Sequence, residues 1–132
     1  MKNKILIVMA DYYETISKGL LHNTKKVLQE QFDLISVPGV FEIPVTIAKN
    51  IKKYDGFIAL GCVIKGETPH FDLISKAAID GIMKLSIEYK KPIGNGIITC
   101  LNLKQAIARQ KKGQEAAAAL LSVLNPVKVS AE

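Results

Sequence analysis

The residues best suited to chemistry lie at the end of an apolar run, in the segment 57–70 (FIALGCVIKGETPH). After the run, Gly66 permits a tight turn, Thr68 is a good helix N-cap, and Pro69 suits the first helical position. The free N–H groups of a helix start bind anions. His70 follows directly and could transfer protons beside such an anion near neutral pH. This segment therefore predicts an anion pocket with an acid–base group beside it.

Each of these features also has a simpler structural explanation. The turn could be an ordinary capped helix start, and Glu67 fits an anion pocket only if its carboxylate points to solvent. His70 could be a polar residue in the first turn of a helix. Arg109, near the end of a later helix, could interact with the helix dipole or bind phosphate. Both explanations stay open for each residue.

Two other candidate ligand-binding loops follow apolar runs. Tyr12 comes after the run 5–10, and its ring could stack on a flat ligand or pack against the protein itself. Glu42 comes after the run 32–37, directly behind Phe41. Its carboxylate could accept hydrogen bonds from ligand hydroxyls or stabilise a helix N-terminus.

Apolar runs alternate with helical patterns along the chain, and these elements would bring the three loops together. We expect strands at Ile5–Ala10, Phe32–Val37, Phe57–Ile64 and Ile93–Cys100. We expect helices at Glu14–Gln31, Glu42–Lys53, Pro69–Tyr89, Leu103–Lys111 and Glu115–Leu124, with Asn102 as a cap and Gly113 as a break. The alternation predicts one α/β domain over residues 1–132, with a four-stranded parallel sheet, helices on both faces and a loose tail at about 125–132. Ligands of such folds bind at the carboxyl ends of the strands, where these loops lie.

Composition indicates a globular domain and argues against several other classes. The 132 residues are 48% hydrophobic and 23% charged, with a net charge of +6. The lysines are scattered without interleaved aromatic residues, so a phosphorylated small molecule is a better partner than nucleic acid. Cys62 and Cys100 lie in apolar segments without metal-ligand spacing, which predicts reduced core thiols, no metal site and a cytoplasmic protein. The short apolar stretch near the N-terminus predicts neither a signal peptide nor a membrane span.

Several segments together resemble one enzyme family. They are VPGVFEIP (37–44), LGCVIKGETPHFD (60–72), PIGNGIIT (92–99), NLKQAIAR (102–109) and KGQEAA (112–117), in this order. The set resembles the lumazine synthases, and the resemblance extends from about Ile5 to Leu124. It implies a flavodoxin-like three-layer α/β/α sandwich that assembles at least into pentamers, with sites between adjacent subunits. It also implies condensation of 5-amino-6-ribitylaminouracil with 3,4-dihydroxy-2-butanone 4-phosphate, without a cofactor or a metal.

The resemblance also implies a role for each matching residue. His70 would move protons, and Arg109 and Lys112 would reach the site from the neighbouring subunit. The residues implied for the pyrimidine and its ribityl chain are Tyr12, Val40, Phe41, Glu42, Cys62, Val63, Ile64, Asn95 and Lys112. The residues implied for phosphate are Gly66, Glu67, Thr68 and Arg109.

The sequence departs from the common family pattern in a few places. Asn95 stands where many members place an aromatic residue of the neighbour, which leaves Tyr12 as the main stacking group. The connection 110–112 is shorter than in capsid-forming members, and the chain begins close to its first strand, so we expect a pentamer or a pair of pentamers. The competing hypothesis is a non-catalytic module of the same fold that binds a flavin or a phosphate ligand. Such a module would need neither His70 nor Arg109.

Overall fold

A parallel sheet forms the centre of the protein, which a computed structural model describes over residues 3–130. Its strands are β1 (Ile5–Ala10), β2 (Phe32–Val37), β3 (Gly56–Ile64) and β4 (Ile93–Cys100), in the order β2-β1-β3-β4. Every pair is parallel, with Ala10 beside Val37 and Met9 beside Leu60. The two central strands are apolar because both of their faces are covered. The predicted strands are confirmed, with β3 starting one residue earlier.

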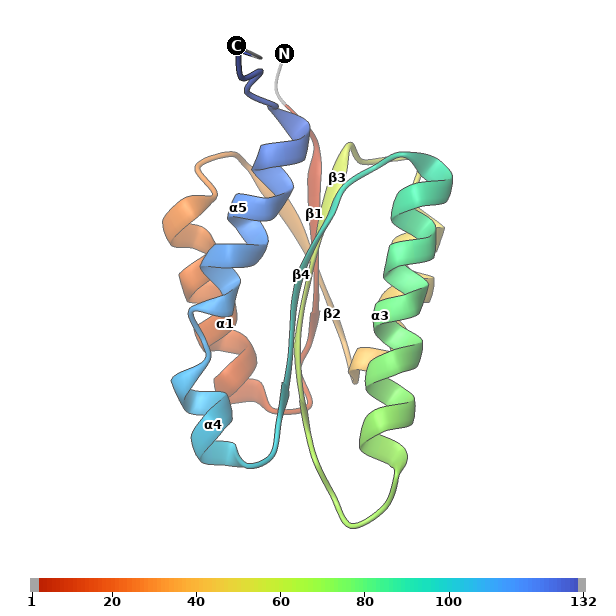
Figure 1. Cartoon of the computed structure of the whole chain (residues 1–132), viewed down its shortest axis with the longest axis vertical. Helices are drawn as coiled ribbons and strands as arrows, with labels where there is room; N and C mark the ends of the chain where they lie inside the picture. The colour runs from red at the N-terminus through yellow and green to blue at the C-terminus, as the bar shows by residue number, and fades with distance from the viewer. Residues whose placement is uncertain (1–2, 131–132) are drawn as a thin grey trace.

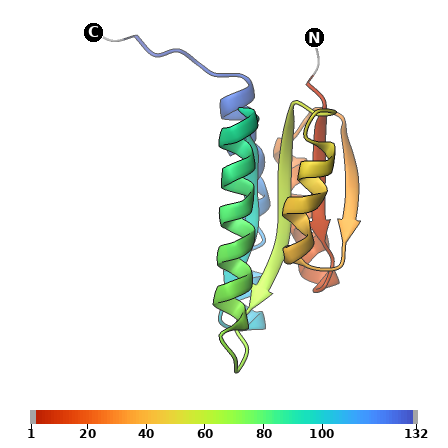
Figure 2. The same cartoon turned by 90° about the vertical axis from the view of Figure 1, so that its right-hand side faces the viewer.

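Helices cover both faces of this sheet (Figure 1). One layer holds α1 (Glu14–Val27), α4 (Leu103–Ala108) and α5 (Lys112–Leu124). The other holds the short 3-10 helix η1 (Val40–Glu42) with α2 (Ile43–Asn50) and α3 (His70–Tyr89), the last two lying side by side in Figure 2. Each layer packs its own cluster of buried aliphatic side chains against the sheet. The architecture is the expected flavodoxin-like three-layer α/β/α sandwich.

Several helices end earlier than the sequence pattern predicts. The first ends at Val27 rather than Gln31, because Leu28 turns to an extended backbone (φ −81°, ψ 104°) and buries its side chain in the core. The second ends at Asn50 rather than Lys53, where a tight turn lets the Lys53 N–H donate to the Asn50 carbonyl (3.0 Å). The fourth ends at Ala108 rather than Lys111, because tight turns lead directly into α5.

The two predicted caps have different outcomes. Asn102 caps α4 as expected, since its Oδ1 accepts a hydrogen bond from the Gln105 N–H (2.9 Å). Thr68 is not the N-cap residue of α3, because the helix starts at His70 and Pro69 occupies the cap position. The Thr68 hydroxyl still accepts a long hydrogen bond from the His70 N–H (3.3 Å). The predicted cap is therefore displaced by one residue.

Gly113 does not break the last helix but lies inside it, so the predicted start at Glu115 is wrong. This glycine allows α5 to approach α1 closely. A Cβ atom there would meet the Leu20 carbonyl oxygen and would lie 3.0 Å from the Thr24 nitrogen. The Thr24 hydroxyl instead lies 3.2 Å from the Gly113 carbonyl and donates to it. Glycine is required here by contact between helices rather than by a turn.

Both described ends of the chain lie at the level of the amino end of the sheet (Figure 1), but the C-terminal tail runs away from the N-terminus in Figure 2. Residues 125–130 form neither helix nor strand, and residues 131–132 of the expected tail lie outside the described residues. No helix within residues 3–130 is long and apolar enough to cross a membrane.

Replacing Gly113 by alanine tests the close contact between α1 and α5. We expect Gly113→Ala to lower the free energy of unfolding by about 2 kcal/mol, because overpacking outweighs the better helix propensity of alanine. Gly66→Ala is the matched control, since a Cβ atom there would meet nothing within 4 Å. Chemical denaturation measures both. A Gly113→Ala protein as stable as the control would contradict the packing.

Candidate active site

A pocket of about 630 Å3 opens at the carboxyl end of the sheet. The three loops expected from the sequence form it together. Its lining residues are Tyr12, Tyr13, Gly39, Val40, Phe41, Glu42, Cys62, Val63, Ile64, His70 and Ile74. The pocket therefore unites the predicted proton-transfer residue with most residues expected to hold a heterocycle and its side chain.

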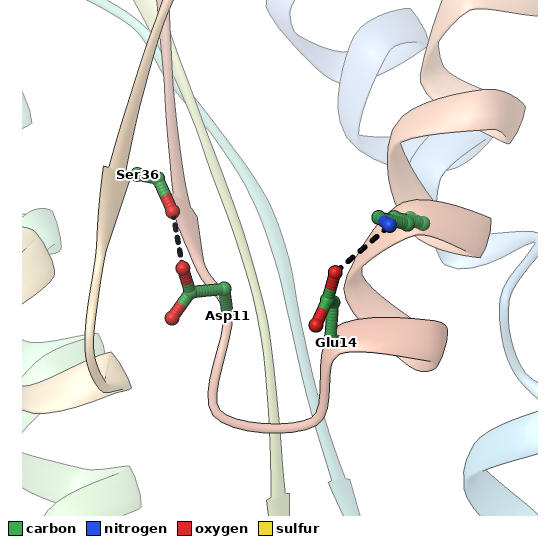
Figure 3. A network of polar contacts seen from close by, with 4 residues as sticks. Asp11, Glu14 and Ser36 are labelled. Atoms are coloured by element: carbon green, nitrogen blue, oxygen red, sulfur yellow. Dashed lines mark hydrogen bonds and ion pairs between the residues drawn. The ribbon is translucent and has the colours of Figure 1, made fainter.

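The loop that carries Tyr12 is held in place at both ends. At its start, the Asp11 N–H donates to the Val37 carbonyl (3.0 Å), and the Ser36 hydroxyl donates to the Asp11 carboxylate (2.7 Å; Figure 3). At its end, Ser17 donates through its N–H to the Tyr13 carbonyl (2.9 Å) and through its hydroxyl to the Ala10 carbonyl. These bonds define the backbone of the loop.

The ring of Tyr12 is presented to solvent rather than packed in the core. It is 75% exposed and meets the ring of Tyr13 edge-on, with 4.9 Å between the ring centroids and 80° between the planes. Tyr12 is therefore not a core residue, and its one ring contact is with Tyr13 among the described residues. An exposed ring of defined orientation is suited to stacking on a flat ligand.

The second loop carries the carboxylate of Glu42. Val40 is buried and fixes η1 against the sheet, while Phe41 is 59% exposed at the pocket. Within residues 3–130 the Glu42 carboxylate makes no hydrogen bond to a cap and no ion pair, although its Oε1 lies close to Gly39. Glu42 is the N-cap residue of α2, so its charge can also favour that helix N-terminus without a hydrogen bond, and both explanations for Glu42 remain. The carboxylate is free to accept hydrogen bonds from ligand hydroxyls.

The third loop leaves the sheet after the Lys65 N–H donates to the Cys100 carbonyl (2.9 Å). Its residues 66–70 are exposed, and only His70 among them lines the pocket. No described glycine has a positive φ, so the turn at Gly66 does not depend on the backbone freedom of glycine. The expected anion turn thus projects past the pocket rather than forming its wall.

Arg109 and Lys112 lie in a second hollow, of about 440 Å3, beside the edge strand β4. The Arg109 guanidinium donates to the Thr99 carbonyl (3.1 Å) instead of the carbonyls that end its own helix. The Lys112 ammonium lies 3.7 Å from the Glu115 carboxylate. Asn95 also lies on β4, where its side chain accepts a hydrogen bond from the Ile97 N–H (3.0 Å). One chain alone therefore does not bring these three residues into the main pocket.

A further hollow of about 520 Å3 lies at the opposite end of the sheet and is less suited to a ligand. Its carboxylate Asp33 already accepts a hydrogen bond from the Tyr54 hydroxyl (2.6 Å). The neighbouring Asp55 accepts one from the Lys4 N–H (2.7 Å). The polar groups there are engaged with one another.

The comparison with protein families identifies the chain. The family model described as 6,7-dimethyl-8-ribityllumazine synthase matches residues 2–128. The chain belongs to this lumazine synthase family. The resemblance drawn from the segments 37–44 and 60–72 is therefore confirmed.

Relatives named 6,7-dimethyl-8-ribityllumazine synthase are similar over most of their length. The protein of Bartonella bacilliformis is 45% identical over 118 residues, which cover 84% of this chain and 78% of the relative. The protein of Agrobacterium fabrum is 41% identical over 138 residues, which cover 93% of each chain. The protein of Limosilactobacillus reuteri is 39% identical over 135 residues, which cover 96% of this chain and 89% of the relative.

Two residues that line the pocket were not expected from the sequence: Gly39 and Ile74. Ile74 is four residues after His70, on the same face of α3, so it could have been found from its spacing. Gly39 could not, because its place depends on how the loop folds back toward Glu42.

The pocket also contains a thiol with a raised pKa. Cys62 and Cys100 are free and buried, as the sequence predicts. Burial raises the pKa of Cys62 to about 12, with a smaller contribution from the neighbouring Cys100 thiol. The pKa of Tyr13 is also raised, mainly by burial and to a smaller extent by the charges of Tyr12 and Cys62. Cys62 is therefore protonated near neutral pH and is not activated as a thiolate, which leaves His70 as the group in the pocket suited to proton transfer.

Alkylation with iodoacetamide tests the protonation of Cys62. A pKa raised from 9.0 to about 12 lowers the thiolate fraction about a thousandfold at pH 8, so the native protein should react slowly. The rate should rise about tenfold for each pH unit up to about pH 12, because the thiolate is the reacting form. Peptide mass spectrometry measures the modification, with the unfolded chain as control. Rapid alkylation of the native protein at pH 8 would exclude the raised pKa.

Proposed function

We propose that this chain catalyses the formation of 6,7-dimethyl-8-ribityllumazine, the penultimate step of riboflavin biosynthesis. The substrates are 5-amino-6-ribitylaminouracil and 3,4-dihydroxy-2-butanone 4-phosphate, and phosphate and water are released. The observation that carries the proposal is membership of the lumazine synthase family over residues 2–128. A pocket with an exposed ring, a free carboxylate and a histidine supports it.

The main pocket would bind the pyrimidine substrate. The Tyr12 ring would stack on the heterocycle, and the strand end formed by Cys62, Val63 and Ile64 would lie along its edge. The loop 40–42 would hold the ribityl chain, because the Glu42 carboxylate is free to accept hydrogen bonds from its hydroxyls.

The phosphate would lie between two subunits. The backbone N–H groups of Gly66, Glu67 and Thr68 would meet it from one side, with Arg109 of the neighbouring copy on the other. Lys112 and Asn95 of that copy would complete the wall of the site. The position of Arg109 and Lys112 beside the edge strand β4, away from the main pocket, supports this arrangement.

Exposed apolar side chains support assembly into a homopentamer or a multiple of it. Leu73 at the start of α3 is 66% exposed, and Ile107 beside Arg109 on α4 is 57% exposed. Phe41, Leu101 and Leu103 are also exposed near the same end of the sheet. Apolar residues gathered around both halves of a site are suited to burial against another copy of the chain. The buried free thiols support a cytoplasmic location, because such thiols persist in reducing compartments.

Every chemical step moves a proton. The amine of the pyrimidine attacks the ketone and loses water to form an imine. A proton then leaves carbon as phosphate departs, and the second amine closes the ring with loss of another water. His70 would carry protons in these steps. Arg109 and the N–H groups of the turn would stabilise the charge that develops on the departing phosphate. Holding both substrates together would supply much of the remaining acceleration.

Mixing the purified protein with both substrates tests the function directly. Product fluorescence should appear with time and should require each substrate. Absence of product would contradict the proposal and would leave a non-catalytic binding module of the same fold.

Two substitutions separate the proposed roles in the same assay. Arg109→Ala should raise the KM for the butanone phosphate at least about tenfold, because a charged phosphate contact is lost. His70→Ala should lower kcat by about a hundredfold or less, since proximity supplies most of the acceleration. Lys104→Ala is a matched charge control, because Lys104 lies on α4 and Arg109 directly follows that helix. It should change neither constant. An unchanged KM in Arg109→Ala would contradict the role of Arg109 in phosphate binding.

Mixed assemblies test whether the site is shared between subunits. Tyr12→Ala and Arg109→Ala chains should each have low activity alone, because each damages one half of every site. Coexpressed and randomly assembled, they should recover about a quarter of the wild-type activity, since some sites then combine two intact halves. Activity no greater than that of the separate variants would place both residues in a site within one chain.

A further inference from the structure

Two thiols lie next to each other behind the wall of the main pocket. In the β3–β4 ladder, Cys62 pairs with Ile98 and Ile64 pairs with Cys100, so the cysteines are diagonal neighbours on adjacent strands. Both belong to the core cluster on the α1–α5 side of the sheet, so they point to the same face. The Cys100 thiol also contributes to the raised pKa of Cys62, after burial. They are therefore a dithiol rather than two isolated cysteines.

The diagonal placement does not favour a disulfide bond. Adjacent strands lie about 4.8 Å apart, and two residues along a strand add about 6.6 Å, which separates the Cα atoms by about 8 Å. A disulfide requires a Cα separation below about 7 Å. A pyramidal atom that bonds both sulfurs at about 2.3 Å holds them about 3.4 Å apart, whereas a disulfide requires about 2.05 Å, so the bridging atom suits thiols on neighbouring strands. The geometry therefore favours a bridging atom over a direct S–S bond.

The dithiol is accessible from one side only. Cys62 lines the pocket of about 630 Å3, whereas Cys100 lies behind it and is 1% exposed. No group of three or more His, Cys, Asp or Glu side chains within residues 3–130 could hold a metal ion. Ions that need four protein ligands are thus poorly served. The pair suits a soft trivalent atom that forms two bonds to sulfur and is already bonded to one other group.

We propose that Cys62 and Cys100 form a dithiol site in the pocket wall that captures organic trivalent arsenicals. With an arsine oxide R–As=O, two As–S bonds form and the As=O bond is lost. Both thiol protons leave with the oxide oxygen as one molecule of water. Arsenic stays trivalent, so the step requires no oxidant or reductant.

Capture would also close the pocket. Because Cys62 is the member that lines the pocket, the organic group on arsenic would project from it toward Tyr12 and Tyr13. The heterocycle of the substrate is proposed to lie in the same space. Inhibition of lumazine formation therefore rests on the proposed function, whereas capture itself does not.

Phenylarsine oxide is the probe, and intact-protein mass spectrometry measures its uptake by the full chain. We expect one phenylarsenic group per chain and the loss of both titratable thiols. Release should occur with 2,3-dimercaptopropanol but not with an equal concentration of a monothiol, because two bonds hold the arsenic. Absence of an adduct on the native protein would overturn the proposal.

Cys100→Ala and Cys100→Val remove one thiol, the second with a side chain that fills the core. Both should bind the probe at least about a hundredfold more weakly and release it to a monothiol, because only one As–S bond remains. Undiminished uptake by a folded variant would overturn the shared site.

Lumazine formation by the wild type should be lost with the probe, while the Cys100→Val protein should stay active. Full activity of the labelled wild type would overturn closure of the pocket. If no lumazine forms even without the probe, the proposed function fails while uptake still tests the dithiol.

Discussion

Parallel pairing of the four strands is the constraint on which the site depends. With Ala10 beside Val37 and Met9 beside Leu60, the strands β1, β2 and β3 end at the same edge of the sheet. The loops after these strands are far apart in the sequence, yet this register places Tyr12, Glu42 and His70 around one pocket. The burial of apolar side chains on both faces keeps the register, because a shift of one residue would turn the core side chains to the opposite face.

Close packing of α5 on β4 and α1 determines where Arg109 lies. A Cβ atom on Gly94 would meet the backbone of Ala116, so the bare backbone of β4 lets α5 lie directly on the edge strand. Gly113 does the same between α5 and α1, and Gln114 donates to the Asn23 side chain across that contact (2.8 Å). The turns that lead into α5 are held against the sheet in this way. They place Arg109 beside the edge strand β4, apart from the main pocket.

The fold could be predicted to a large extent, and the errors have identifiable causes. Continuous apolar runs define the buried strands, so those boundaries were correct to within one residue. Helix ends were less certain, because Leu28 continues the helical pattern yet leaves the helix to fill the core. Gly113 was taken as a break because glycine is a poor helix former, whereas its role is to allow contact between helices. The pattern of residues along one helix does not show where the neighbouring helix packs.

The sequence by itself determined the order of strands and helices, the apolar core segments and the family, because these depend on residue types and short-range spacing. Only the tertiary structure decided that the Tyr12 ring is exposed, that the Glu42 carboxylate is free, and that Arg109 lies apart from the main pocket. It also decided that Cys62 and Cys100 are neighbours. The physical reason is that each of these facts depends on strand register and on packing between residues distant in the chain, which no local pattern encodes.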